Sequence, residues 1–392
     1  MRAPRILYHH RTRAFDGQAV HIQEMLRALK AVGMSVEEVS LVQQGQPMDR
    51  PSGKSEGGAG FWQSIRLPRA VVELAEHLYS YKGRSLLQEA GRRGPCDLIY
   101  ERHALNCRAG LWASRKLDVP FFLEVNSPMV EEMEALGLLR FPRWARRVER
   151  EILSAADRIF VVSEVLGEML LPLGAREDRI VVTPNGADLP AFEAAHRKQL
   201  ARLEAGTPIR TLGFIGFPRA WHRLDLALHA LSDLCGEYAD LQLRILGEGP
   251  AIVELQSLAR QLGIEDALQV LGSCSREELP ARVAELDLAL IPAMNAYASP
   301  LKLYDSLAAG VPTLAPDQSN LRESVRDGES AFLFEPGQQA AFTARLREIL
   351  ADPAGSRRVG EAGRDSLIQA DRTWEANART IHREWQDLEG CS

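Results

Sequence analysis

A short run near the C-terminal end of the chain combines residue types that suit binding of a nucleotide diphosphate. Residues 298–312 follow a predicted strand, and a helix is expected to begin within them, with Lys302 and Asp305 in its first turns. The N–H groups and partial positive charge of a helix N-terminus attract phosphate, and Lys302 adds a full charge. Asp305 shares the same helix face, where its carboxylate can accept from sugar hydroxyls. The alternative is an ordinary helix start with a solvated lysine.

A basic turn follows the first predicted strand of the second half, residues 211–216. It carries Arg219, His222 and Arg223 where a phosphate would arrive. An arginine fork binds phosphate through two hydrogen bonds, so the turn fits either a phosphate site or a solvated basic turn. Residues 247–250 form another strand-end turn, which by itself indicates no more than a turn.

Several nucleotide-binding signatures are missing from the sequence. There is no GxxxxGK[ST] loop and no GxGxxG fingerprint, which argues against a P-loop enzyme and a dinucleotide oxidoreductase. There is also no Asp-x-Asp pair, which many sugar transferases use to hold a nucleotide diphosphate through a divalent metal. If the chain is such a transferase, positive side chains and helix ends must replace the metal, and Arg219, His222 and Lys302 fit that role.

The N-terminal half gives weaker signals. Gly17 lies in the turn after the first predicted strand, and a glycine there lets the backbone approach a ligand closely. A simple tight turn explains it equally well. His21 begins the predicted helix at 21–32 and is either a functional side chain or a capping or half-buried histidine.

One stretch, from Arg140 to Arg150, is strongly basic. Arg143, Arg147 and Arg150 share a face of a predicted helix, with aromatic residues beside it. This pattern fits peripheral contact with an anionic membrane surface, and it also fits a solvated face of a core-packed helix.

The composition is that of a globular protein without a strong charge bias. The chain has 392 residues, of which 45% are hydrophobic and 26% charged, and its net charge of −6 gives no support to nucleic-acid binding as the main role. Its cysteines are scattered without zinc-type spacing. With no leader segment or bilayer-length apolar stretch in view, we expect a cytoplasmic protein, with the basic stretch as a contact at the inner face of the membrane.

Short apolar strands alternate with amphipathic helices along the chain. Such strands are typical of parallel sheets covered on both faces, and each half has enough of them for its own doubly wound domain. We therefore predict an α/β protein with domains at 1–190 and 208–372, a boundary within 190–208, and a final helix at about 373–390 that packs back on the first domain. Ligands bind at the carboxyl ends of such strands, so two facing domains would form a cleft. The expected strands are residues 5–10, 36–42, 97–102, 120–125, 158–163, 180–185, 211–216, 241–247, 268–273, 288–293, 311–316 and 331–335.

Taken together, the motifs resemble the family-4 retaining glycosyltransferases of the GT-B fold (glycosyl transferases group 1), over nearly the whole chain. The match rests on order and spacing rather than on one motif. The pair Trp221-His222 is similar to that of a subgroup with Trp-His after the first strand of the C-terminal domain. The matching segments are DG at 16–17, EVNSP at 124–128, VVSE at 161–164, TPNGAD at 183–188, RAWH at 219–222, GEGP at 247–250, SPLK at 299–302 and AAGVP at 308–312.

The resemblance implies two facing Rossmann-like domains, of which the C-terminal one binds a sugar nucleotide and the N-terminal one the acceptor. Lys302 would hold the diphosphate, helped by Arg219 and His222. Backbone groups at 273–274 would face the nucleobase. His21, Glu124 and Asn126 are candidates for orienting sugar hydroxyls. The expected donor-binding residues are Gly17, Gly216, Gly247, Ser273, Cys274, Ser299, Pro300, Leu301, Lys302 and Asp305.

Some positions depart from the family pattern. The first acid of the usual acid–x7–acid pattern is Tyr297, and the second is Asp305, one methylene shorter than glutamate. Arg223 stands where a glycine is usual, and Asn126 where a histidine is usual. These departures leave the donor sugar and the catalytic competence open.

The expected reaction is transfer of a hexose from a nucleotide diphosphate sugar, a UDP or GDP sugar above all, to an acceptor hydroxyl with retained configuration. The acceptor is a glycan, a lipid-linked molecule or a small molecule, and no metal or other cofactor is expected. Two alternatives stay open. One is a GT-B-like sugar-nucleotide epimerase or pseudo-sugar transferase. The other is a non-catalytic partner subunit, which the missing acid at Tyr297 favours.

Overall fold

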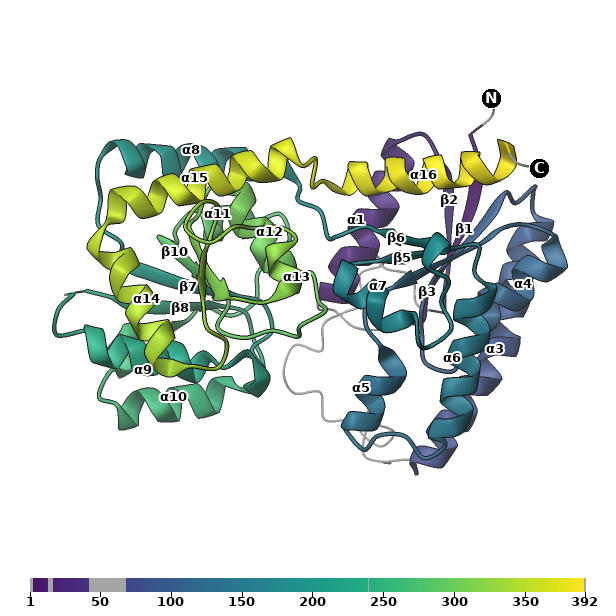
Figure 1. Cartoon of the computed structure of the whole chain (residues 1–392), viewed down its shortest axis with the longest axis horizontal. Coiled ribbons are helices and arrows are strands. Elements are labelled where there is room, and N and C mark those ends of the chain that lie inside the picture. Colours follow the sequence, from purple (N-terminus) through teal and green to yellow (C-terminus); the bar gives the residue numbers. More distant parts are fainter. Residues whose placement is uncertain (1–2, 13–16, 42–67, 239, 391–392) are drawn as a thin grey trace, which may run out of the picture. The chain divides into compact units, whose positions relative to one another are not determined.

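The chain folds into two α/β units, each built on a six-stranded parallel sheet. The structure is a computed structural model and describes residues 3–12, 17–41, 68–238 and 240–390. The first unit consists of Met1–Thr183 and Ala378–Ser392, and the second of Pro184–Asn377. Strands form at each of the twelve places that the sequence predicts, so the predicted pair of doubly wound sheets is confirmed. Figure 1 shows the strands of each unit packed among helices.

The sheet of the first unit has the order β2-β1-β3-β4-β5-β6. The next strand in the chain, β2, lies on one side of β1, and β3 lies on the other side. The topological switch point is therefore between β1 and β3. Its elements are β1 (Arg5–His9), α1 (Gly17–Ala31), β2 (Ser35–Val39), α3 (Arg69–Arg92), β3 (Leu98–Arg102), α4 (Ala109–Leu117), β4 (Phe121–Val125), α5 (Met129–Ala135), α6 (Pro142–Ala155), β5 (Arg158–Val161), α7 (Glu164–Leu170), the 3-10 helix η1 (Glu177–Arg179) and β6 (Ile180–Val182).

The sheet of the second unit has the order β12-β11-β10-β7-β8-β9, with its switch point between β7 and β10. Its elements are α8 (Leu189–Glu204), β7 (Thr211–Ile215), η2 (Ala220–His222), α9 (Leu224–Leu234), β8 (Gln242–Leu246), α10 (Ile252–Gln261), η3 (Glu265–Ala267), β9 (Leu268–Val270), α11 (Leu279–Val283), β10 (Leu288–Leu290), α12 (Leu301–Ala308), β11 (Thr313–Pro316), α13 (Ser319–Arg322), β12 (Phe332–Phe334), α14 (Gln339–Ala351) and α15 (Pro353–Gln369).

Alternation along the strands gives the second unit an apolar core on each face of its sheet. Leu288 and Leu290 of β10 join one core, whereas Ala289 and Ile291 join the other. Successive side chains of a strand point to opposite faces, so a continuous apolar run fills both cores. Both cores fix the sheet, and the strand ends that carry the functional residues are held with it.

The division between the units differs from the prediction. It lies between Thr183 and Pro184 rather than within residues 190–208. The charged, alanine-rich segment that suggested a boundary forms α8, which packs on α11, α12 and α15 of the second unit. The last helix, α16 (Trp374–Gly390), begins in the second unit and contributes Ala378 onward to the first. In the described part of the chain, no helix combines the length and apolarity needed to cross a membrane.

Candidate functional site

Lys302 lies at the carboxyl end of β7, at the switch point of the second sheet. It is the second residue of α12, and its Nζ lies 3.9 Å from the ring centre of Phe214 on β7. A Cβ added to Gly216 would lie 3.8 Å from this Nζ, so the glycine leaves the backbone open beside the ammonium. Burial lowers the pKa of Lys302 to about 7. A nearby phosphate would restore the charged form, which makes Lys302 a suitable phosphate-binding group.

His222 packs on the same phenylalanine and is held neutral. Its ring lies 5.0 Å from that of Phe214 in an edge-on arrangement, and its Nδ1 accepts a hydrogen bond of 3.0 Å from the backbone N–H of Arg219. Burial, together with the charges of Lys302 and Arg219, lowers the pKa of His222 to about 3. In the protein without ligand, His222 is therefore neutral rather than a source of positive charge. With Nδ1 accepting, the ring proton is on Nε2, and His222 offers a neutral N–H donor.

The two arginines of the basic turn differ in their contacts. Arg219 is exposed, and its guanidinium lies 5.0 Å from the ring centre of Phe217. Arg223 binds the carboxylate of Asp225 through Nε and Nη2, at 3.0 and 2.9 Å. Within the ranges that the structure describes, Arg219 forms no ion pair, whereas Arg223 is paired with Asp225 in the first turn of α9.

The segment before α12 is fixed by hydrogen bonds from the first residues of the second unit. The backbone N–H of Asn185 donates to Ser299 Oγ at 3.0 Å, and Asn185 Nδ2 donates to Ser299 O at 2.5 Å. Ser299 Oγ in turn donates to Tyr304 OH at 2.9 Å. Ser299 is therefore a positioning residue, because its hydroxyl and carbonyl are both engaged within the protein. It sets the entry of Pro300 and Leu301 into the helix, whose first N–H groups have no acceptor within it.

Asp305 does not present an open carboxylate. It is buried, and its Oδ1 lies 2.8 Å from Nη1 of Arg276, in the loop that follows β9. The expected contact of Asp305 with ribose hydroxyls would thus involve an Arg276–Asp305 pair rather than a carboxylate alone. Nothing in the local sequence around Arg276 signals this pairing, because it depends on how the β9–α11 loop meets α12.

The remaining expected donor-binding positions lie on neighbouring strand ends. Gly247 has φ +156°, and a Cβ there would overlap the carbonyl oxygen of Gly216, so the turns after β7 and β8 touch through backbone. The loop with Ser273 and Cys274 follows β9, and both the N–H and the hydroxyl of Ser273 face Glu248 Oε1, at 3.5 and 3.4 Å. This brings Gly216, Gly247 and Ser273 to one edge of the sheet, as parallel topology requires.

In the first unit the structure brings His21, Glu124 and Asn126 together around one carboxylate. Glu124 lies at the end of β4, and its Oε1 is 3.0 Å from His21 Nε2 and 2.8 Å from Asn126 Nδ2. Arg102, the register partner of Glu124 on β3, binds the same oxygen. The other oxygen accepts from two buried hydroxyls, those of Tyr8 and Tyr100.

The environment keeps Glu124 ionised. Burial alone raises the pKa of this carboxyl, but the charges of His21 and Arg102 and the hydrogen bonds from His21 and Asn126 outweigh it and hold the pKa well below its ordinary value. Glu124 is therefore better suited to orienting His21 and Asn126 than to taking up a proton. Gly17 lies at the start of α1, the helix that carries His21.

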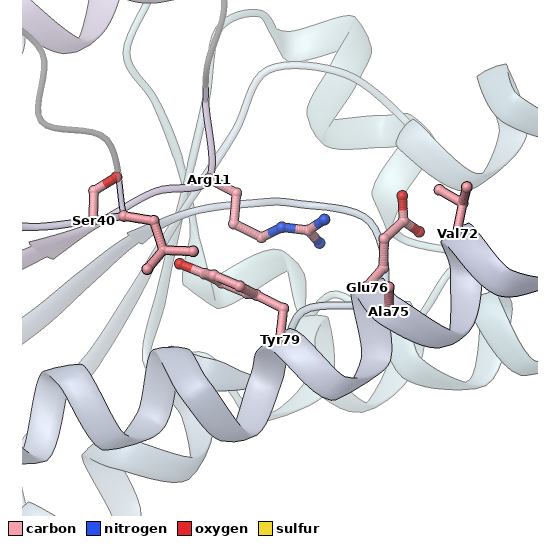
Figure 2. A pocket seen from close by; sticks show the side chains of 7 residues that line it. Arg11, Ser40, Val72, Ala75, Glu76 and Tyr79 are labelled. Carbon is pink, nitrogen blue, oxygen red and sulfur yellow. The ribbon is translucent and has the colours of Figure 1, made fainter. Parts of the chain in front are cut away.

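A pocket of about 380 Å³ opens beyond β1 and β2, against α3 (Figure 2). The guanidinium of Arg11 lies 4.9 Å from the ring centre of Tyr79 and donates to Leu105 O at 2.8 Å. A cation, a carboxylate and hydroxyl groups on one pocket suit a ligand with several hydroxyls. The lining residues are Arg11, Ser40, Leu41, Val72, Ala75, Glu76 and Tyr79.

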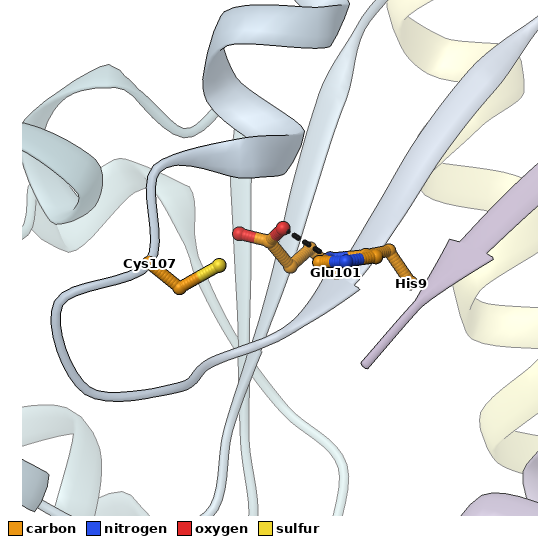
Figure 3. A group of neighbouring side chains, drawn as sticks. All are labelled: His9, Glu101 and Cys107. Carbon is orange, nitrogen blue, oxygen red and sulfur yellow. Dashed lines mark hydrogen bonds and ion pairs between the residues drawn. The ribbon is translucent and has the colours of Figure 1, made fainter. Parts of the chain in front are cut away.

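A second buried polar group lies at the ends of β1 and β3 (Figure 3). His9 Nδ1 is 2.5 Å from Glu101 Oε2, and Gly110 N donates to the same oxygen at 2.7 Å. Together with Cys107 Sγ, their potential ligand atoms lie within 4.8 Å of one another, a spacing that could suit a metal ion. However, His9 and Glu101 already bind each other, and burial keeps the pKa of Cys107 far above its ordinary value, so the thiol is protonated. We interpret this group as a structural contact that links β1 and β3.

Sequence reasoning missed several of these neighbours. Arg102 had a readable signal, because it ends a predicted strand on the edge where ligands bind. Arg276, Arg11 and Asn185 lie in loops, and their roles follow only from the folded path of the chain.

Two family models match the sequence, one over each half. The model described as Glycosyltransferase Family 4 matches residues 15–190, and the model described as Glycosyl transferases group 1 matches residues 200–366. The second match contains β7, the Trp221-His222 turn and α12, and the first contains α1 and β4.

Known glycosyltransferases resemble the whole chain. A D-inositol 3-phosphate glycosyltransferase of Streptomyces avermitilis is 27% identical over 368 residues, covering 88% of this chain and 78% of that protein. Sucrose-phosphate synthase of Thermosynechococcus elongatus superposes with a TM-score of 0.74 at 18% identity, over 99% of this chain and 100% of the other. HepE of Anabaena in complex with UDP superposes with a TM-score of 0.68 at 15% identity, over 99% and 100%. The chain is therefore a protein of the GT-B fold whose two halves match glycosyltransferase family 4 and the glycosyl transferases of group 1.

Proposed function

We propose that this protein is a retaining glycosyltransferase that moves a sugar from a nucleoside diphosphate sugar to an acceptor hydroxyl. The observation that carries the proposal is the arrangement at the end of β7, where Lys302 and His222 flank Phe214 beside Gly216. One cation and one neutral N–H donor at an open backbone suit a diphosphate. The match of this half to the group 1 glycosyl transferases supports the proposal.

In the proposed reaction, the bond between the anomeric carbon and the diphosphate oxygen breaks while the acceptor oxygen attacks from the same face. The acceptor proton passes to the departing phosphate oxygen, so no protein nucleophile takes part. Lys302 and His222 Nε2–H stabilise the charge that develops on the diphosphate, and Arg219 is close enough in sequence to join them. Because these groups carry the charge, the proposed reaction needs no divalent metal.

The donor base and the acceptor are proposed from the two strand-end regions. Backbone groups of the Ser273–Cys274 loop face the base, and UDP is the first nucleotide to test because HepE was solved with UDP. In the first unit, His21 and Asn126 orient sugar hydroxyls from the anchored Glu124. The pocket against α3 takes an acceptor with several hydroxyls.

The test is a thermal-shift panel of UDP, GDP, ADP, dTDP and CDP, in EDTA and again in Mg²⁺. A nucleotide at about 100 times its dissociation constant adds about 2.7 kcal/mol to the stability of the folded state. We expect a shift with one nucleotide in EDTA, lost in Lys302→Ala and retained in Arg260→Ala, an exposed arginine on α10 that serves as a control. No shift with any nucleotide would contradict the proposed donor site.

Activity follows with the matching sugar nucleotide. Lys302→Ala should lower kcat/KM by about 10²–10³, the usual loss when one preorganised charge-stabilising group is removed. Unchanged turnover would contradict the role of Lys302, and formation of an inverted linkage would contradict retention.

A further inference from the structure

The first three turns of α3 bury polar side chains and expose apolar ones. Glu73, His77 and Ser80 are buried, whereas a stripe of large apolar side chains faces solvent. A helix that packs on a core turns its apolar stripe inward. The stripe residues are three or four positions apart and are between 46% and 58% exposed; they are Val71, Leu74, Leu78 and Tyr81.

The buried polar edge of α3 is bound to the segment that leads from α5 into α6. Arg69 Nε donates to Leu138 O at 3.0 Å, the backbone N–H of Phe141 donates to Glu73 Oε2 at 2.9 Å, and the rings of His77 and Trp144 stack with centres 3.5 Å apart. Figure 1 shows α3 and α6 running side by side.

These contacts bring further exposed apolar side chains beside the stripe. They are Leu136, Phe141 and Trp144. With the stripe they make seven of the fifteen exposed large hydrophobic side chains in the described part of the chain, so the clustering is not the ordinary scatter of single residues on a surface.

The apolar cluster is bordered by positive charge. Arg143, Arg147 and Arg150 are exposed on one face of α6, next to the face that carries Trp144. Among the residues that the structure describes, none of these three arginines forms an ion pair, whereas Arg146 is paired with Glu134. In a chain of net charge −6, this is a local departure from the overall sign. We call the stripe, the three apolar residues of α5–α6 and these arginines the α3–α6 surface.

We propose that the α3–α6 surface docks on an anionic lipid bilayer. Leucine and aromatic side chains enter the boundary between headgroups and acyl chains, and flanking arginines bind lipid phosphates. A second copy of this chain is a poorer occupant, because a twofold contact would place two positively charged surfaces against each other. Charge complementarity therefore selects the bilayer.

The docking surface has a consequence for the acceptor, and this step rests on the proposed function. The pocket of Figure 2 is lined by Val72, Glu76 and Tyr79, on the side of α3 adjacent to the stripe. A bilayer bound to the stripe would lie next to the pocket opening. The inferred acceptor class is a hydroxyl-bearing headgroup or lipid-linked sugar presented at a membrane surface.

The experiment is flotation of the full chain with vesicles of phosphatidylcholine alone and of equal parts phosphatidylcholine and phosphatidylglycerol. We expect binding to the mixed vesicles, weakened by salt, and little binding to phosphatidylcholine alone. Leu74→Ser with Leu78→Ser, and separately Arg143→Glu with Arg147→Glu, should each weaken binding by about tenfold or more. All four positions are exposed, so we expect these variants to fold like the unmodified chain.

The matched controls lie on α10 of the second unit. Val253 is 72% exposed and Arg260 is exposed, so Val253→Ser with Arg260→Glu replaces one apolar and one basic side chain in the same way, away from the α3–α6 surface. This double variant should float like the unmodified chain. Equal binding of every variant, or no binding to the mixed vesicles, would overturn the proposal. If the unmodified chain forms dimers and the Leu74→Ser with Leu78→Ser variant is monomeric, the surface serves self-association instead. The nucleotide shift should persist in all variants, which separates this proposal from that of the donor site.

Discussion

The protonation state of Lys302 depends on whether a ligand is bound. Its pKa of about 7 in the free protein means that much of it is neutral at physiological pH, while a bound diphosphate requires the ammonium. We predict that UDP affinity falls as pH rises from about 7 to about 9, by up to about tenfold per pH unit, because the lysine must first take up a proton. Calorimetric titration in buffers of different ionisation heat would show that uptake. Lys302→Arg stays charged and should show a flat profile; the same slope in both proteins would contradict the assignment.

Without ligand, the same lysine makes the stability depend on pH in a defined window. Its ordinary pKa is 10.5, so between about 7 and 10.5 the unfolded chain binds more protons than the folded one. The free energy of unfolding should therefore gain from this group as pH rises through that window. Lys302→Met, which has no such group, should lack this gain when urea titrations at about pH 7 and about pH 9 are compared.

Arg223 occupies a backbone conformation that suits glycine. Its φ is +52°, in the left-handed region where a side chain costs about 1 kcal/mol. Its exposed ion pair with Asp225 offsets little of this energetic cost. We predict that Arg223→Gly is about 1 kcal/mol more stable than Arg223→Ala in urea unfolding, because both lose the ion pair and only glycine relieves the strain. Equal stability of the two variants would show that no strain is present.

At the scale of elements, the turns after β7 and β8 depend on the absence of side chains. Gly247→Ala would place a Cβ against the carbonyl oxygen of Gly216, beside Lys302. We predict a loss of roughly 2–4 kcal/mol in stability together with a loss of the nucleotide thermal shift. Gly236→Ala is the control, since a Cβ there meets no atom within 4 Å. A normal nucleotide shift in Gly247→Ala would show that the turn does not form the donor site.

The elements themselves were predictable because buried parallel strands leave a strong pattern in the sequence. Each predicted strand formed, and α12 begins where Pro300 and Lys302 suggested. The boundary was not predictable from composition, because α8 has the charged, alanine-rich sequence of a linker and yet packs by one face. The closed pair Arg276–Asp305 was also out of reach, since a sequence motif gives the position of a side chain but not the partner that reaches it from another loop.

At the scale of the whole molecule, the last helix completes the first unit. Ile381 is fully buried, and Glu384 Oε2 lies 2.6 Å from Arg158 Nε of β5. We predict that deletion of residues 378–392 destabilises the first unit by several kcal/mol while the second unit keeps its stability, because the lost apolar and ionic contacts all belong to the first unit. Limited proteolysis should then cut preferentially within residues 1–183. Equal resistance of the shortened and full chains would contradict this.

Because the second unit interrupts the first, the two units are completed at different points along the chain. The second unit is one continuous segment, 184–377, whose start and end are tied together by the Ala187–Thr373 bridge and by Asn377 Nδ2, which donates to Pro184 O at 2.6 Å. All of its residues are therefore present once the chain reaches residue 377. The first unit begins earlier in the chain but needs residues 378–392, so a chain truncated after residue 377 would contain the whole second unit and an incomplete first one.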